Sequence, residues 1–319
     1  MEPQILGIHH VTALASDPQR NLDFYTGVLG LRLVKLTINF DDPGTYHFYF
    51  GDGQGNPGTI LTFFPWPNAP RGRRGTGQVT VTSFSVPEGA FGYWTERFRQ
   101  QNVSFELPFT RLEEEVLTFY DPDGLQLELV AHPGATARSG WEGGPVPIES
   151  AVRGFYSVTL AEEGYERTAA LLTETMGFRL VAEDGNLFRY AMGAGGAGAL
   201  VDVRCLPDAP RGTVLAGTVH HVAWRTPDDA QQQMWRQQLA ALRYNVSPVM
   251  DRQYFHSIYF REPGGVLFEI ATDPPGFAID ETPERLGTRL MLPPMYESQR
   301  ERIEQSVPPI RLPGGEEPK

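Results

Sequence analysis

Two histidine pairs stand in closely similar surroundings near the two ends of the chain. His9-His10 lies in Gly-Ile-His-His-Val-Thr-Ala and His220-His221 in Thr-Val-His-His-Val-Ala-Trp, and together they hold four of the seven histidines. Their apolar and β-branched neighbours predict a short buried strand at each pair. Because adjacent strand residues point to opposite faces, one histidine of each pair must face inward. Neutral imidazole is a common ligand of divalent metals, so the recurrence favours a metal site over packed histidines.

Glu269 is a candidate third ligand. Its neighbours Val266, Leu267, Phe268 and Ile270 are apolar. A carboxylate in such surroundings is tolerated when it is paired or bound to a metal. With one histidine from each pair it would form the two-histidine, one-carboxylate set of non-haem Fe(II) oxygenases.

An internal repeat predicts the elements that must position these residues. Residues 29–34 (Leu-Gly-Leu-Arg-Leu-Val) match 176–181 (Met-Gly-Phe-Arg-Leu-Val), and 122–128 match 263–269, so one half of the chain duplicates the other. Each half divides again into two βαβββ modules. The helices of the four modules are expected near 18–28, 89–101, 164–176 and 227–242. Asp17 and Pro18 form a good helix start, and Gly30 a good stop.

The predicted fold class is α+β, with four βαβββ modules paired into two cupped mixed β-sheet domains. Only modules 1 and 4 carry histidine pairs; module 3 has Phe155-Tyr156 in that place, and module 2 has residues 79–81. A shared metal therefore requires module 1 to pair with module 4, and module 2 with module 3. Glu128, the repeat equivalent of Glu269, then lacks histidine partners, and a structural or vestigial role is expected for it.

The domain organisation follows from the repeat and from composition. Residues 1–135 form an N-terminal half of two modules, and residues 136–153, rich in Gly and Pro, form a linker. Residues 154–279 form the C-terminal half, and residues 280–319 an extension in which 295–305 could form a short amphipathic helix.

The bulk composition excludes several classes of function. A net charge of −12, without a basic stripe, argues against a nucleic-acid partner. No run of 18 apolar residues is present, so no membrane span is expected. The start has no signal-peptide pattern, and the single Cys205, which we expect to pack as a small hydrophobe, allows no internal disulfide. These features predict a cytoplasmic protein and leave open whether it forms a homo-oligomer.

Taken together, these motifs resemble the vicinal oxygen chelate superfamily, and within it the ring-cleaving dioxygenases of the hydroquinone dioxygenase type. The resemblance covers residues 5 to about 305 and includes Phe24-Tyr25, Lys35 and residues 46–50 and 57–59. It implies that Fe(II), with Mn(II) as the alternative, is bound by His10, His221 and Glu269. It also implies that the pocket contains His9, Thr12, His220, Arg252 and Tyr259. His256 departs from the pattern, because relatives can carry Glu there, and this leaves the ring substituents undefined.

The function implied by the resemblance is extradiol-type cleavage of a hydroquinone or catechol, a small aromatic diol, with O₂ as co-substrate. Catalytic roles are expected for His9, His220 and Tyr259, and substrate binding for Thr12, Arg252 and His256. Phe48, Trp224 and Phe255 are expected to line the pocket.

Two alternatives remain open at this stage. A glyoxalase-like metal-dependent lyase or isomerase usually requires a fourth protein ligand on the closing strand of the partner module, where Phe63-Phe64 stands here. A non-catalytic binding protein of the bleomycin-resistance type is generally metal-free. Retention of all three ligands therefore argues against the second alternative.

Overall fold

The structure is a computed structural model that describes residues 3–313. These residues form two eight-stranded sheets, and the predicted α+β class with four βαβββ modules is confirmed. Module 1 comprises β1 (Ile8–Ala15), α1 (Pro18–Asp23) with η1 (Phe24–Val28), β2 (Arg32–Asn39), β3 (Asp42–Gly51) and β4 (Ile60–Pro65). Module 2 comprises β5 (Gln78–Val86), α2 (Phe91–Gln100), β6 (Phe109–Arg111), β7 (Glu114–Tyr120) and β8 (Gln126–Ala131).

The second half of the chain repeats this order. After η2 (Pro133–Ala137), module 3 comprises β9 (Phe155–Glu162), α3 (Glu166–Ala170) with η3 (Leu171–Thr175), β10 (Arg179–Asp184), β11 (Leu187–Ala191) and β12 (Leu200–Cys205). Module 4 comprises β13 (Val219–Thr226), α4 (Asp229–Ala241), β14 (Met250–Asp251), β15 (Phe255–Arg261) and β16 (Leu267–Pro275). The C-terminal extension contains η4 (Phe277–Ile279), η5 (Pro283–Arg285), η6 (Pro294–Gln299) and α5 (Arg300–Ser306).

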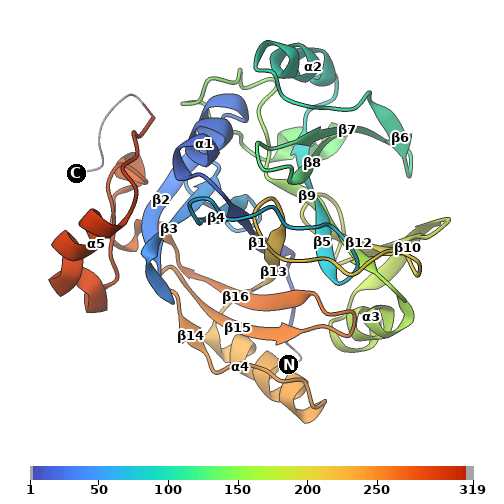
Figure 1. The fold of residues 1–319 in the computed structure, drawn as a ribbon. Helices are drawn as coiled ribbons and strands as arrows, with labels where there is room; N and C mark the ends of the chain where they lie inside the picture. The colour runs from blue at the N-terminus through green and yellow to red at the C-terminus, as the bar shows by residue number, and fades with distance from the viewer. Residues whose placement is uncertain (1–2, 314–319) are drawn as a thin grey trace.

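The modules pair as the histidine argument predicts. The first sheet has the order β14-β15-β16-β13-β1-β4-β3-β2, and the second has the order β10-β11-β12-β9-β5-β8-β7-β6. Module 1 therefore joins module 4 through the antiparallel pair β1–β13, and module 2 joins module 3 through β5–β9. In Figure 1 the blue N-terminal strands accordingly lie beside the orange strands near the C-terminus. Each sheet thus contains strands from both halves of the duplicated sequence.

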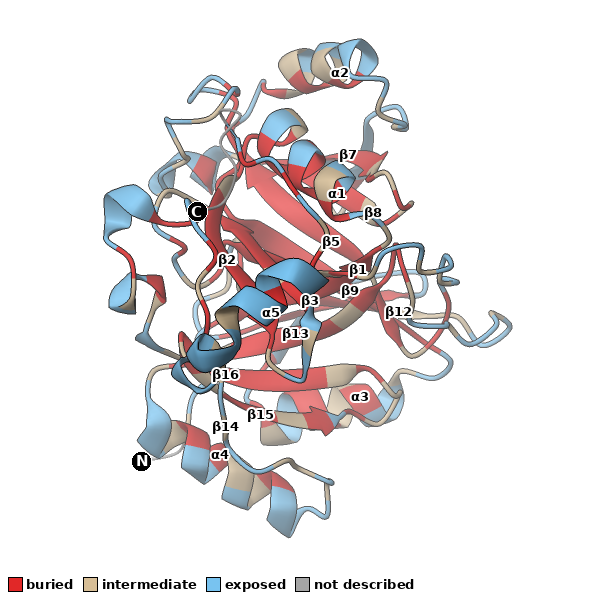
Figure 2. Ribbon diagram, turned by 60° about the vertical axis from the view of Figure 1, so that its left-hand side comes forward, coloured by how far each residue is buried: buried red, intermediate tan, exposed pale blue. Residues whose placement is uncertain are grey.

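The helices cover the sheets and leave the strands as the buried part of the molecule. Figure 2 shows buried strands between helices whose outer faces are exposed. Helix α1 begins as expected, with the Asp17 carboxylate accepting a hydrogen bond from the Arg20 amide at 2.9 Å. It ends before Gly30, whose φ of +69° suits glycine. No helix within residues 3–313 is long and apolar enough to cross a membrane.

The C-terminal extension packs against module 1. The Lys35 side chain is fully buried, and its Nζ lies 2.5 Å from both Asp280 Oδ1 and Glu281 Oε2. The Met291 amide also donates to the Leu36 carbonyl at 2.9 Å. The extension therefore holds the outer strands of module 1 in place.

Candidate metal centre

A β-bulge lies at each histidine pair. On β1, Ile8 pairs with Trp224 but His10 pairs with Ala223, so His9 is an extra residue in the ladder. On β13, the step from His221 to Val219 in the same ladder makes His220 the extra residue. A bulge interrupts the alternation of side chains between the two faces. The two rings of each pair can therefore contact each other, which corrects the expectation that simple strand alternation separates them.

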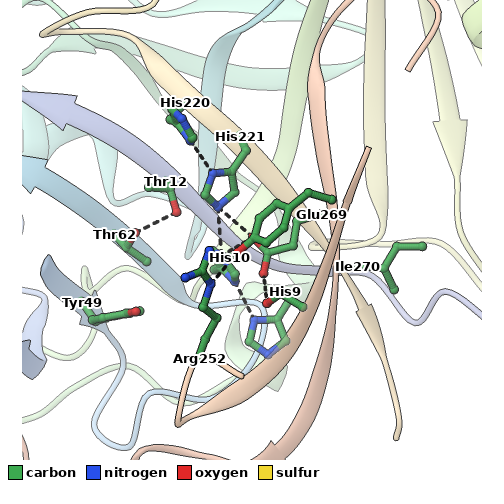
Figure 3. A network of polar contacts seen from close by, with 12 residues as sticks. His9, His10, Thr12, Tyr49, Thr62, His220, His221, Arg252, Glu269 and Ile270 are labelled. Carbon is green, nitrogen blue, oxygen red and sulfur yellow. Dashed lines mark hydrogen bonds and ion pairs between the residues drawn. The ribbon is translucent and has the colours of Figure 1, made fainter. Parts of the chain in front are cut away.

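The three predicted ligands converge. His221 Nε2 lies 2.9 Å from Glu269 Oε2, His10 Nε2 lies 3.3 Å from the same oxygen, and the two Nε2 atoms are 3.3 Å apart. Figure 3 shows the three side chains pointing toward one another from β1, β13 and β16. Ligand atoms about 2.1 Å from a metal and at right angles around it lie about 3.0 Å from each other. The observed separations fit one divalent ion bound on one face.

Burial and charge support the same assignment. All three residues are at most 5% exposed, and within residues 3–313 they are the one group of His, Cys, Asp and Glu found to converge in this way. Burial alone would raise the pKa of Glu269, but the imidazoles of His10 and His221 outweigh this and hold it well below its usual range. Burial likewise lowers the pKa of His221. An ionised carboxylate is the form that binds a metal.

The other histidine of each pair orients its neighbour. His9 Nδ1 lies 2.9 Å from His10 Nδ1, and His220 Nδ1 lies 2.7 Å from His221 Nδ1. If Nε2 of each ligand binds the metal, its Nδ1 carries the proton and donates to the neighbouring ring. Burial lowers the pKa of both acceptors, to about 3 for His220 and well below the usual range for His9, so both are neutral.

A cavity of about 320 Å³ opens beside the ligands. Four residues that the resemblance assigns to the pocket, Thr12, His220, Arg252 and Tyr259, line this cavity together with Phe255. Arg252 Nε donates to the Tyr259 hydroxyl at 3.2 Å, and a terminal nitrogen of Arg252 reaches Asp41 Oδ2 at 3.1 Å. This contact joins module 4 to the loop between β2 and β3 of module 1.

The remaining predicted site residues lie outside this lining. His9 is buried against His10 and Phe255, so it contacts the ligand rather than the cavity. The His256 ring points away toward α4, where Nδ1 lies 2.6 Å from Asp229 Oδ1. The structure thus brings His256 to a different surface from the other candidates.

The expectation that Phe48 and Trp224 line the pocket is wrong. Both are fully buried in the main core, where Trp224 packs against Phe178 and Phe268. The physical reason is strand alternation: His47 and Tyr49 face the cavity, so Phe48 between them faces the other side of β3.

Several polar residues of the site were missed at the sequence level, among them Ser257, His47 and Tyr49. The Ser257 hydroxyl donates to Glu269 Oε1 and so leaves Oε2 free for a metal. His47 and Tyr49 line the cavity from module 1. A signal was present for Ser257, because it lies two residues before Tyr259 on one strand and must share its face. The tract Tyr-His-Phe-Tyr-Phe at 46–50 contained the same signal for the other two.

The two modules around the metal centre are related by an approximate twofold axis. Glu269 pairs with Ala223 on β13 and with Tyr259 on β15. In the same way, Thr62 pairs with Thr12 on β1 and with Tyr49 on β3. The counterpart of Glu269 in module 1 is therefore Thr62, which corrects the expectation of Phe63-Phe64 at that position. The Thr62 hydroxyl therefore occupies the position where a fourth protein ligand, a carboxylate, would be needed.

The second sheet contains the related position without a metal centre. Its register makes Ser157 and Val81 the counterparts of His10 and His221, so Tyr156-Ser157 rather than Phe155-Tyr156 matches the histidine pair. Glu128, the counterpart of Glu269, is 2% exposed and accepts two hydrogen bonds from Arg111, at 3.0 and 2.8 Å. An arginine thus neutralises this glutamate.

Fold and site together define a protein of the vicinal oxygen chelate type. The sequence profile of the glyoxalase/bleomycin resistance protein/dioxygenase superfamily matches residues 7–129 and 155–270, and the chain belongs to this superfamily.

Two relatives within this superfamily are similar to the chain over nearly its whole length. The chain is 50% identical over 315 residues to "Putative ring-cleaving dioxygenase MhqO" of Bacillus subtilis (strain 168), covering 98% of this chain and 99% of that protein. It is 35% identical over 306 residues to "Chlorohydroquinone/hydroquinone 1,2-dioxygenase" of Sphingobium indicum, covering 94% and 95%.

Solved structures agree with the fold. A crystal structure titled as a putative dioxygenase from Bacillus subtilis superposes with a TM-score of 0.92 at 49% identity and covers 98% of this chain and 99% of that one. Glyoxalase I from Zea mays has a TM-score of 0.63 at 14% identity, with 84% and 92% covered, and shares the fold alone.

Proposed function

We propose that the protein is an Fe(II)-dependent dioxygenase that cleaves the ring of a hydroquinone or catechol, with O₂ as co-substrate. The observation that carries the proposal is the convergence of His10, His221 and Glu269 at one end of a cavity lined by aromatic and polar side chains. Three protein ligands on one face leave positions for further ligands. The relatives named as ring-cleaving dioxygenases support this reading.

The cavity suits a single aromatic ring. A cavity of about 150 Å³ is enough to hold benzene, so about 320 Å³ leaves room for ring substituents or a second small molecule. Phe255, Phe64 and Trp66 supply apolar contacts. Arg252 lies beside Tyr259 and supplies a positive charge for an ionised phenol oxygen.

The protein groups around the ring can hold and move protons. When bound, Fe(II) would lower the pKa of a phenol and hold the diol and O₂ side by side, with the diol supplying the electrons that reduce O₂. Burial and the nearby Glu269 carboxylate raise the pKa of Tyr259, so its hydroxyl keeps its proton and can donate to a substrate oxygen. The neutral His220 ring on the cavity wall accepts from His221 at Nδ1, so its Nε2 carries the proton and can donate a hydrogen bond to a bound oxygen.

Anaerobic reconstitution provides the test. Protein loaded with Fe(II) or, separately, Mn(II) is mixed with hydroquinone, catechol and ¹⁸O₂, and the product is examined by mass spectrometry. We expect both labelled atoms in one ring-opened product. Incorporation of a single labelled atom, or no turnover of any dihydroxybenzene with either metal, would reject the proposal.

The glyoxalase-like alternative is weaker on a specific observation. Thr62 occupies the position related to Glu269, and a neutral threonine hydroxyl is a poor substitute for a carboxylate ligand. Isomerisation of a hemithioacetal by the metal-loaded protein in the absence of O₂ would favour that alternative instead.

A further inference from the structure

Four side chains of module 1 form a continuous hydrogen-bonded chain along the cavity. The Tyr49 hydroxyl lies 2.9 Å from His47 Nδ1, His47 Nε2 lies 2.9 Å from Thr62 Oγ1, and Thr62 Oγ1 lies 2.8 Å from Thr12 Oγ1. Tyr49, His47 and Thr12 line the cavity, whereas Thr62 is fully buried behind it. In Figure 3, Thr12 and Thr62 are joined beside the metal ligands, and Tyr49 lies on the same side.

The number of protons in this chain requires its two ends to behave differently, one as a hydrogen-bond donor and the other as an acceptor. Burial, with His10 and His221 nearby, holds the pKa of His47 well below its usual range, so one ring nitrogen donates and the other accepts. Burial raises the pKa of Tyr49, which therefore keeps its hydroxyl proton. Four protons serve three links, so one proton remains, at one end or the other. The chain thus offers a donor at one end and an acceptor at the other.

The two ends lie at different distances from the metal ligands. Thr12 is on β1, the strand of His10, and is the direct cross-strand partner of His221. Tyr49 is on β3, two strands further along the sheet. Since neighbouring strands are about 4.8 Å apart, Thr12 and Tyr49 can contact two separate points of a bound molecule.

We propose that the chain Thr12–Thr62–His47–Tyr49 is the part of this site that recognises the second hydroxyl of a bound 1,4-diol. The proposal rests on the function proposed above. A 1,4-diol that binds the metal through one oxygen carries its other hydroxyl across the ring, and the proposal assigns that hydroxyl to Tyr49 on the cavity wall. A 1,2-diol that chelates through both oxygens presents no oxygen there. His47 and Thr62 are positioning residues, because they act by fixing which end of the chain donates.

The test compares two ligands without turnover. Dissociation constants of hydroquinone and of phenol, which lacks the second hydroxyl, are measured anaerobically by calorimetry on Fe(II)-loaded protein. The substitution Thr62→Val cuts the chain at a residue outside the cavity lining. It should reduce the preference for hydroquinone over phenol about three- to tenfold, the size of one neutral hydrogen bond. Thr62→Ser should restore the preference.

A matched control exists on the neighbouring strand. Thr37 is fully buried, pairs with His47 across the ladder, and its hydroxyl makes no hydrogen bond. Thr37→Val should leave the preference within twofold of wild type. An unchanged preference in Thr62→Val, or an equal loss in Thr37→Val, would overturn the assignment.

A second measurement does not depend on a variant folding. In zinc-loaded protein, the ¹⁵N shifts of the His47 ring report which nitrogen carries the proton. Hydroquinone should fix one tautomer and phenol should not; equal shifts with both ligands would overturn the assignment. If Fe(II)-loaded wild-type protein binds neither ligand, the proposed function fails and the assignment falls with it. If it binds hydroquinone but the comparisons above fail, the assignment alone is lost.

Discussion

The buried ion pair between Arg111 and Glu128 can be used to test why only one of the two sheets has the candidate metal centre. Removing the guanidinium by Arg111→Met leaves a 2%-exposed carboxylate whose remaining side-chain donor is the Ser83 hydroxyl at 2.7 Å. Breaking a buried pair in this way costs about 3–5 kcal/mol, whereas an exposed pair is worth up to about 1 kcal/mol. The expected loss is a large fraction of the stability of an ordinary domain, about 5–15 kcal/mol.

Urea unfolding of four proteins measures this loss. The set comprises wild type, Arg111→Met, Glu128→Leu and the double variant. The double variant should lie within about 1.5 kcal/mol of wild type, because apolar side chains of similar size often replace a buried ion pair without loss. A loss below about 1 kcal/mol for Arg111→Met, or a double variant as unstable as that single variant, would refute this account of the pair.

The same variants test whether Glu128 can become a ligand of a second metal ion. If an arginine merely blocked a second site, its removal would create one. The counterparts of the histidine ligands are Ser157 and Val81, which offer no imidazole, so Arg111→Met should still bind one iron per chain. Two irons per chain would show that Glu128 is a latent ligand.

Three further outcomes are expected. His10→Ala should remove most bound iron without changing the far-ultraviolet circular dichroism, whereas His256→Ala, outside the cavity, should keep full iron content; retained iron in the first variant would contradict the ligand assignment. Tyr259→Phe should lower kcat for diol cleavage by about 10²-fold while iron content stays constant, and an unchanged kcat would remove its catalytic role. Burial, reinforced by Glu262, raises the pKa of Glu162 to about 8. The folded protein therefore holds a proton that the unfolded chain releases near pH 4.5, and stability should fall from there to about pH 8, by up to about 1.4 kcal/mol per pH unit. Glu162→Gln should flatten that slope in denaturant titrations, and a slope equal to that of wild type would show that Glu162 is already ionised.

The pairing of modules, and the convergence of the two histidine pairs with Glu269, could be predicted because they depend on residue identity. A metal shared by two imidazoles requires the strands that carry them to be neighbours, and only modules 1 and 4 carry such pairs. The repeat then placed Glu269 on the strand next to one pair. Neither the pairing of the modules nor the position of Glu269 depends on the exact strand register, so both could be predicted without knowing it.

Side-chain directions could not be predicted in the same way, because they depend on register. A bulge adds one residue and reverses the alternation beyond it, and nothing in the residue types of His9 or His220 marks a bulge. The residue type of Phe48 likewise indicates that the side chain is apolar, but it does not indicate which side of β3 the side chain faces. The burial of Lys35 against Asp280 depends on a contact across 245 residues, which local patterns do not contain.

The difference between Glu269 and Thr62 would make an otherwise symmetric site favour an anionic ligand once a divalent metal is bound. Two neutral imidazoles and one carboxylate leave a divalent ion with one net positive charge in a buried place, and such a charge is costly unless it is compensated. A carboxylate in place of Thr62 would compensate it from within the protein. With a hydroxyl there instead, the compensating charge would have to come from the molecule in the cavity, and the ionised phenol oxygen of the proposed substrate would supply it. On the function proposed above, the asymmetry of this one residue pair would place the diol on the module 1 side of the site.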